Sequence, residues 1–215
     1  MEQGAVLPEA EITSKLRPIS EKEWRTGYGS LGLLAQLDAF IKTPEWKPCV
    51  DDEDDRLSIP VAGQHSFGSL VVAHRSLGIK VVIIDPPAVS RSEWRTIPAI
   101  HTRGVQQCPY QINIHRSFDA DDDLRDQSAH GLWERKVLTC DIIEYLLTSF
   151  ALHVRNDGEG RLDDGGTGTL CAGTRRGEFS PIASYCTLRK QLQIAWVNIR
   201  SLPLNFGARE VFQPA

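Results

Sequence analysis

A long apolar stripe in the middle of the chain constrains the fold more than any other feature. The acidic run FDADDDLRD precedes this stripe, and carboxylates are stabilised at the positive N-terminal end of a helix. We therefore predict one long helix over about residues 124–150, or from about residue 132 if Gly131 breaks it, and this helix needs one broad surface to pack against. The residues that recur at helical spacing are Leu132, Trp133, Val137, Cys140, Ile143, Leu147 and Phe150.

Four stretches around this helix have the composition of β-strands. Residues 70–74 and 79–84 are short apolar runs separated by turn residues, and residues 110–118 alternate apolar and polar side chains. Residues 182–199 are typical of two strands, or of one long bent ribbon. Together with the helix they predict an α+β fold in which one mixed or antiparallel sheet carries the helix across it.

The rest of the chain predicts a single domain, residues 23–201, with extended segments at its ends. Residues 1–22 show no sustained periodicity, and we expect them to form an arm that orders on a partner. An amphipathic helix is expected over residues 30–42. Residues 155–181 are rich in glycine and predict a long loop, while residues 202–215 are expected to form a tail.

Composition excludes several classes of protein. The formal net charge is −4, so contact with nucleic acid is not implied by charge. No apolar run reaches the ~20 residues of a membrane helix, and the polar start of the chain is not typical of a secretory signal. Five scattered cysteines argue against a disulfide framework and against a zinc ribbon.

The triplet Asp85-Pro86-Pro87 raises the question of catalysis. It resembles the motif of amino-methyltransferases, in which an acidic or amide residue and two prolines end a strand and hold the amine. That resemblance implies a nucleic-acid- or nucleotide-modifying enzyme, which is the alternative function. However, Ala88 stands where the family has an aromatic residue, and no strand with a glycine-rich cofactor loop precedes the triplet. We expect Asp85 to close a strand instead.

Other candidate sites are weaker. His101 and His115 lie on neighbouring predicted strands and could share a metal ion, but no third ligand is apparent. Cys140 falls on the apolar face of the predicted helix, which favours a place in the core. We therefore expect no catalytic residue, no cofactor and no bound metal.

The order of elements from Ile97 to Ile199 resembles that of bacteriophage tail-terminator and tail-completion proteins. The resemblance rests on the strand Ile97-Pro98-Ala99-Ile100, the alternating strand, the helix and the closing ribbon. It implies a structural protein without enzymatic activity that forms a ring, commonly a hexamer. Such a ring joins tail-tube and head-connector proteins in a virion that is assembled in the host cytoplasm.

Contacts between subunits are expected to involve charged residues. Arg175 and Arg176 in the glycine-rich stretch could face an acidic stretch of a neighbouring subunit or partner. Exposed pairs of this kind contribute only ~0–1 kcal/mol each, so they would set register more than affinity. The acidic residues are Asp51, Asp52, Glu53, Asp54 and Asp55.

Overall fold

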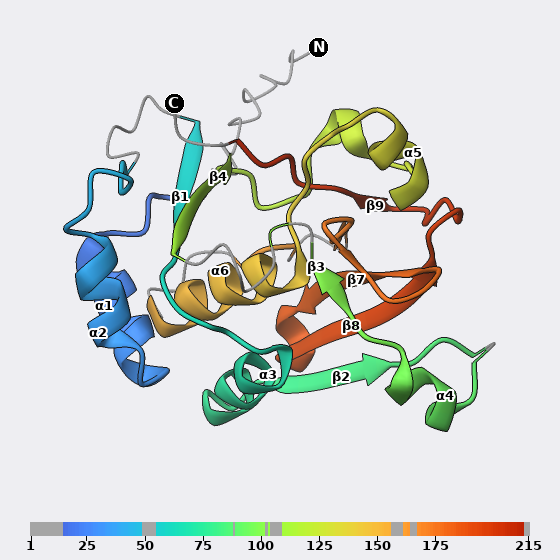
Figure 1. Cartoon of the computed structure of the whole chain (residues 1–215), viewed down its shortest axis with the longest axis horizontal. Helices are drawn as coiled ribbons and strands as arrows, with labels where there is room; N and C mark the ends of the chain where they lie inside the picture. The colour runs from blue at the N-terminus through green and yellow to red at the C-terminus, as the bar shows by residue number, and fades with distance from the viewer. Residues whose placement is uncertain are drawn as a thin grey trace, which may run out of the picture.

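The α+β class is confirmed by a computed structural model, which describes residues 15–48, 55–87, 89–101, 103, 109–155, 161–163 and 167–212 (Figure 1). The helices are α1 (Glu21–Ser30), α2 (Leu34–Phe40), α3 (Phe67–Ser76), α4 (Arg91–Thr96), α5 (Ala129–Glu134) and α6 (Ile142–Arg155), with short 3-10 turns η2 (Asp122–Leu124) and η3 (Thr187–Arg189). The strands are β1 (Arg56–Val61), β2 (Lys80–Ile84), β3 (Ile100–His101), β4 (Tyr110–His115), β5 (Gly168–Leu170), β6 (Thr174–Arg175), β7 (Phe179–Cys186), β8 (Gln191–Asn198) and β9 (Phe206–Gly207).

The described strands form three sheets, so the expectation of a single sheet is wrong. The largest has the order β2-β8-β7-β5-β9, in which β2 runs parallel to β8 and β9 runs parallel to β5. Strand β4 lies where the alternating strand was expected, but it is not half-buried, since Gln111 and Asn113 are buried as well as Ile112 and Ile114. It pairs antiparallel with β1 instead of joining the ribbon. The closing ribbon is confirmed as β7 and β8, which pair antiparallel over eight residues each.

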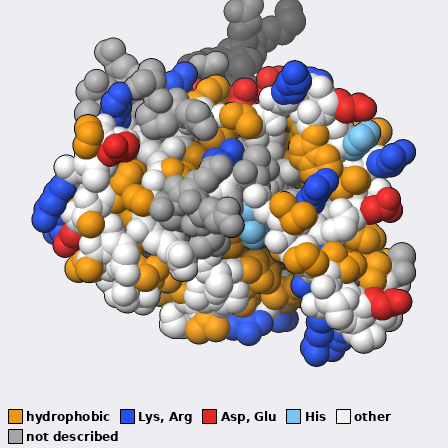
Figure 2. Space-filling model, viewed as in Figure 1, with side chains coloured by type: hydrophobic (Ala, Val, Ile, Leu, Met, Phe, Trp, Pro, Cys, Tyr) orange, Lys and Arg blue, Asp and Glu red, His pale blue; other side chains and the backbone are white. Residues whose placement is uncertain are grey.

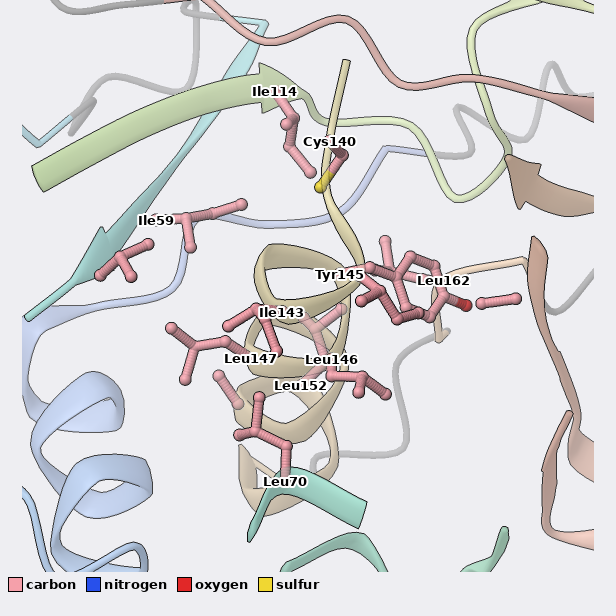
Figure 3. Packing of buried hydrophobic residues seen from close by; sticks show 14 of the residues in the cluster. Ile59, Leu70, Ile114, Cys140, Ile143, Tyr145, Leu146, Leu147, Leu152 and Leu162 are labelled. Atoms are coloured by element: carbon pink, nitrogen blue, oxygen red, sulfur yellow. The ribbon is translucent and has the colours of Figure 1, made fainter. Parts of the chain in front are cut away.

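Helix α6 lies at the centre of the molecule. Every residue from Ile142 to Leu152 is buried, so the helix is covered on all sides. Figure 3 shows Ile143 and Leu147 on its side toward β1, and Tyr145 on the other side next to Leu162. Burial of a large aliphatic side chain contributes about 1.5–3 kcal/mol, and this helix therefore organises the main core.

The single long helix predicted over residues 124–150 is divided into η2, α5 and α6. Helix α5 ends where Lys136 adopts a positive φ of 58°. The chain then runs extended, and Thr139 bridges to Glu210 in the C-terminal segment. A new cap starts α6, because Asp141 Oδ1 accepts the Glu144 N–H at 2.9 Å.

The strand predicted over residues 70–74 is instead part of helix α3. Ser66 and Ser69 cap its N-terminus reciprocally, as in a capping box. Leu70, Val71 and His74 then fall at helical spacing and are buried, and the helix packs against α6. The apolar run is too short for its spacing to distinguish a strand from a helix. Burial against the rest of the domain therefore determines that this stretch is helical.

Both ends of the described chain pack into the domain. Leu16 and Ile19 are buried, so the domain begins before the expected boundary at residue 22. Helix α2 lies within the region of the helix expected over residues 30–42. Helix α1, which was not expected, ends at Ser30 and is separated from α2 by a turn at Gly32, whose φ is 72°.

The two segments expected to be irregular contain strands. The expected glycine-rich loop contains β5, β6 and the start of β7, and the expected tail contains β9. Ala208, Arg209 and Val211 beyond β9 are buried. These segments therefore complete the sheet and the core instead of extending from it.

Candidate functional site

A cleft of about 380 Å³ opens at the carboxyl end of β2, beside helix α4. In open sheets, ligands commonly bind beyond the carboxyl ends of parallel strands, and β2 and β8 are such a pair. The residues that line the cleft are Phe67, Ile83, Asp85, Arg91, Trp94, Arg95, Ala99, His101, Ile142, Arg176 and Trp196. They come from α3, β2, α4, β3, α6, β8 and the turn after β6.

Two tryptophans form a rigid part of this lining. Trp94 and Trp196 are almost fully buried and meet edge to face, with ring centroids 5.0 Å apart. A capping box formed by Ser90 and Glu93 starts α4 and so fixes the position of Trp94. The guanidinium of Arg176 lies 4.6 Å from the centroid of the Trp94 ring, which is within cation–π range.

His101 connects the cleft to a buried ionic cluster. Its Nδ1 lies 2.9 Å from Thr174 Oγ1 and 4.0 Å from Asp141 Oδ2. Burial lowers the pKa of His101, and the charge of Glu144 opposes that shift. Behind it, Arg103 donates from Nε and Nη2 to the two carboxylate oxygens of Glu144, at 2.5 and 2.7 Å.

Asp141 and Glu144 share this buried site, and among the described residues Arg103 is the cation that pairs with Glu144. Burial, followed by the negative charge of Glu144, raises the pKa of Asp141 to about 8. The side chain therefore retains its proton near neutral pH, while the Glu144 carboxylate oxygens accept the hydrogen bonds from Arg103. This cluster secures the start of α6 behind the cleft.

A second buried cluster lies at the C-terminal segment. Arg209 donates from Nη2 to Asp163 Oδ1 at 3.0 Å and from Nε to Thr169 Oγ1 at 3.0 Å. Both members of the ion pair are almost completely buried. Burial raises the pKa of Asp163, and Arg209 opposes that shift. These contacts hold the C-terminal segment in the domain, and none of these residues lines the cleft.

The outer edge of β2 is the second notable surface. Lys80 N–H donates to Lys190 O at 2.9 Å, and the alternation of a strand then directs the N–H and C=O groups of Val81 and Ile83 away from β8. Strand β2 pairs with β8 alone among the described strands. At the opposite end of the sheet β9 is covered, because Gly207 bridges to Arg125.

Exposed apolar side chains gather around this edge. Figure 2 shows hydrophobic side chains along the lower margin of the molecule, where Figure 1 places α3 and β2. Five of the ten large apolar side chains that are exposed in the described part of the chain lie on α3, on β2 or in the turns that adjoin β2. They are Val72, Leu77, Ile83, Ile84 and Leu188.

The structure separates the residues that the sequence grouped as contacts. Arg176 lines the cleft, whereas the preceding Arg175 stacks over Trp133, 5.9 Å from its ring centroid. Asp55 is exposed and pairs with Lys15 at 3.0 Å. The other acidic candidates, Asp51, Asp52, Glu53 and Asp54, lie outside the described residues.

The structure also shows where the candidate catalytic and metal-binding residues lie. Asp85 lies at the cleft, where Arg91 Nε is 3.6 Å from its Oδ2. His101 and His115 belong to different sheets, so the expectation of neighbouring strands is wrong. Within the described ranges, no three His, Cys, Asp or Glu side chains are grouped closely enough to hold a metal ion. Cys140 is buried, as its place on the apolar stripe predicts.

The sequence did not indicate the cleft itself. Trp94 and Trp196 are separated by about half the chain, and no spacing rule connects them. The only local signal was the capping pattern of Ser90 and Glu93, which predicts a helix start just before Trp94.

Comparisons with known proteins give no relative. No protein-family model matches the chain, and neither the curated proteins nor the solved structures contain a match. Among the described residues, no helix has the length and apolar character needed to cross a membrane.

Proposed function

We propose that this protein is a structural assembly protein whose subunits associate through the open edge of β2. One observation carries the proposal: half of the exposed large apolar side chains surround the one end of the main sheet that is uncovered in the described chain. Natural sheets usually protect such an edge with charges, prolines or bulges. Within β2 the only charged residue is Lys80, at its start, and Arg75 from α3 donates to the outward Val81 O at 3.4 Å, so the edge is covered only in part.

The strand is suited to pairing with a second copy of itself. Antiparallel pairing about a two-fold axis at Val82 would place Val81 opposite Ile83 of the second copy, and these are the residues with outward backbone groups. The same arrangement places Ile79 opposite Asp85 of the second copy. Arg75, which donates to Val81 O at 3.4 Å, would then lie near that carboxylate and add a complementary charge.

A ring requires a further contact. Two-fold pairing of β2 closes on itself, whereas a ring needs two different surfaces that meet head to tail. Arg176 in the cleft and the acidic stretch 51–55 of a neighbour could supply that contact, in keeping with the sequence resemblance to phage tail terminators. More specifically, we propose that the protein is a tail-terminator or neck protein of a virion.

Mass measurement with a matched pair of variants tests the proposal. We expect the full chain to form a species of at least twice the mass of one chain in light scattering after size exclusion. Ile84→Lys introduces a charge at the open edge, where Ile84 is 43% exposed, and should shift the mass toward that of one chain. Leu204→Lys is the control, because Leu204 is 74% exposed but lies next to β9, at the opposite end of the sheet from β2.

The outcomes separate the possibilities. A monomer at all accessible concentrations would refute assembly, and an unchanged mass for Ile84→Lys would refute the role of β2. A stable dimer would support β2 pairing without a ring. A larger closed species that Ile84→Lys divides into smaller units would support both contacts.

A further inference from the structure

The cleft contains a guanidinium that is already fixed in position. Arg176 Nε donates to Ile97 O, and the guanidinium plane is held near the face of Trp94. Among the described residues, its two Nη groups have no hydrogen-bond partner. An arginine held in this way offers a planar pair of donors that matches the two oxygens of a carboxylate.

His101 provides a second polar group in the same cleft. Thr174 Oγ1 accepts the Ile142 N–H at 3.0 Å, and its own O–H can donate to His101 Nδ1, which places the imidazole proton on Nε2. That Nε2 has no partner among the described residues. It is therefore available to donate to an anion bound in the cleft.

The remaining lining suits an aromatic body with negative charge. Trp94 and Trp196 supply aromatic surface, and Ile83 and Ile142 supply aliphatic surface. Of the charged lining residues, three are arginines and one is Asp85, which favours an anion. A volume of about 380 Å³ is at the small end of ligand pockets, which suits a compact molecule.

We propose that this cleft binds a small aromatic carboxylate of one or two rings. The carboxylate pairs with the Nη groups of Arg176 and accepts a hydrogen bond from His101 Nε2. The ring system packs against Trp196 and the aliphatic lining. This site is separate from the pairing of β2, which depends on outward backbone groups. It uses the same Arg176 as the ring contact proposed above, so a bound carboxylate and the acidic stretch of a neighbour would compete for that side chain.

Titration of the full chain with naphthoate, followed by calorimetry and tryptophan fluorescence, tests this site. We expect saturable binding of one naphthoate per chain, and binding of the neutral naphthylmethanol at least about tenfold weaker, because a hydrogen bond to a charged group is lost. Arg176→Gln should weaken naphthoate binding by about 10- to 100-fold. Arg175→Gln is the matched control and should leave it unchanged, because Arg175 lies over Trp133 outside the cleft.

Several results would overturn the proposal. They are the absence of saturable naphthoate binding, equal affinity for the neutral analogue, and equal effects of the two arginine variants. Inorganic phosphate that competes at the same concentration as naphthoate would mark a general anion site, which also contradicts an aromatic ligand. Displacement of naphthoate by an acidic DDEDD peptide at equal concentration would assign the cleft to a protein segment instead. The comparison of naphthoate with naphthylmethanol uses the native chain, so it tests the proposal even if Arg176→Gln misfolds.

Discussion

Replacement of Asp141 by Asn should make the protein less sensitive to alkaline pH. Asp141 Oδ1 accepts the Glu144 N–H, and Glu144 Oε2 accepts the Asp141 N–H at 2.8 Å, so the two side chains cap α6 reciprocally. Arg103 binds Glu144 with two hydrogen bonds, and in the part of the chain that the structure describes no Lys or Arg forms an ion pair with Asp141. An Asn keeps the capping oxygen and cannot ionise.

The size of this effect follows from the pKa. Asp141 has a pKa of about 8 in the folded chain, whereas an exposed carboxyl has a pKa of about 4. The folded state then holds a proton that the unfolded chain has released, so the stabilisation is complete below about pH 4 and is lost as the pH rises to about 8. The slope is about 1.4 kcal/mol per pH unit, which gives at most about 4 kcal/mol between about pH 5 and about pH 8.

Urea unfolding followed by tryptophan fluorescence measures this difference. We expect the free energy of unfolding of Asp141→Asn to exceed that of the native chain increasingly as the pH rises through that window. Glu144→Gln is the contrasting variant, because it leaves the buried Arg103 without its ionic partner and should cost about 3–5 kcal/mol. Parallel pH profiles for Asp141→Asn and the native chain, or equal losses in the two variants, would refute the reasoning.

Three further outcomes follow from the geometry. Asp85→Asn should change the free energy of unfolding by less than about 0.5 kcal/mol, since its partner Arg91 is largely exposed. It should leave the assembled mass unchanged, because an exposed charge contact with Arg75 of a second copy contributes at most about 1 kcal/mol. A large loss of a measured methyl-transfer activity would instead support the enzyme alternative. Gly168→Ala would place a Cβ 2.3 Å from a Phe206 ring carbon and should cost about 1–3 kcal/mol in thermal or urea unfolding, and an unchanged midpoint would contradict that crowding. Deletion of residues 1–22 removes buried side chains including Leu16, so it should lower stability by at least about 1.5 kcal/mol as well as affecting assembly; unchanged unfolding of the truncated chain would contradict this.

The sequence predicted correctly those strands that remain strands whichever neighbouring strand they pair with. The runs of β4, β7 and β8 are strands wherever they pair, and Pro86 stops β2 whatever surrounds it. The alternation along β4 nevertheless predicted a polar exposed face wrongly, because Gln111 and Asn113 are buried. The pairing of β4 with β1 could not be predicted, because alternation does not specify the partner strand and no strand was expected over residues 56–61. The same limit explains why one sheet was expected where three are found.

The division between α5 and α6 depends on contacts that are distant in sequence. Cys140 N–H donates to Arg209 O at 2.9 Å, and Thr139 bridges to Glu210. The C-terminal segment thus holds residues 137–141 in an extended form, although their apolar spacing is helical. Arg209 is itself held by the buried Asp163, and a segment that looked like a loose tail in fact decides where the central helix begins.

The residues that form the cleft could not be predicted from local sequence either. Two stretches, SEKEW and SRSEW, each begin a helix with a Ser–Glu capping box and place a tryptophan directly after the glutamate. Trp24 enters the main core and Trp94 enters the cleft, and both are almost completely buried. The local pattern therefore predicts two capped helices with a buried ring. Only the path of the chain after each helix decides that Trp94, and not Trp24, meets Arg176 and Trp196 to form a candidate binding site.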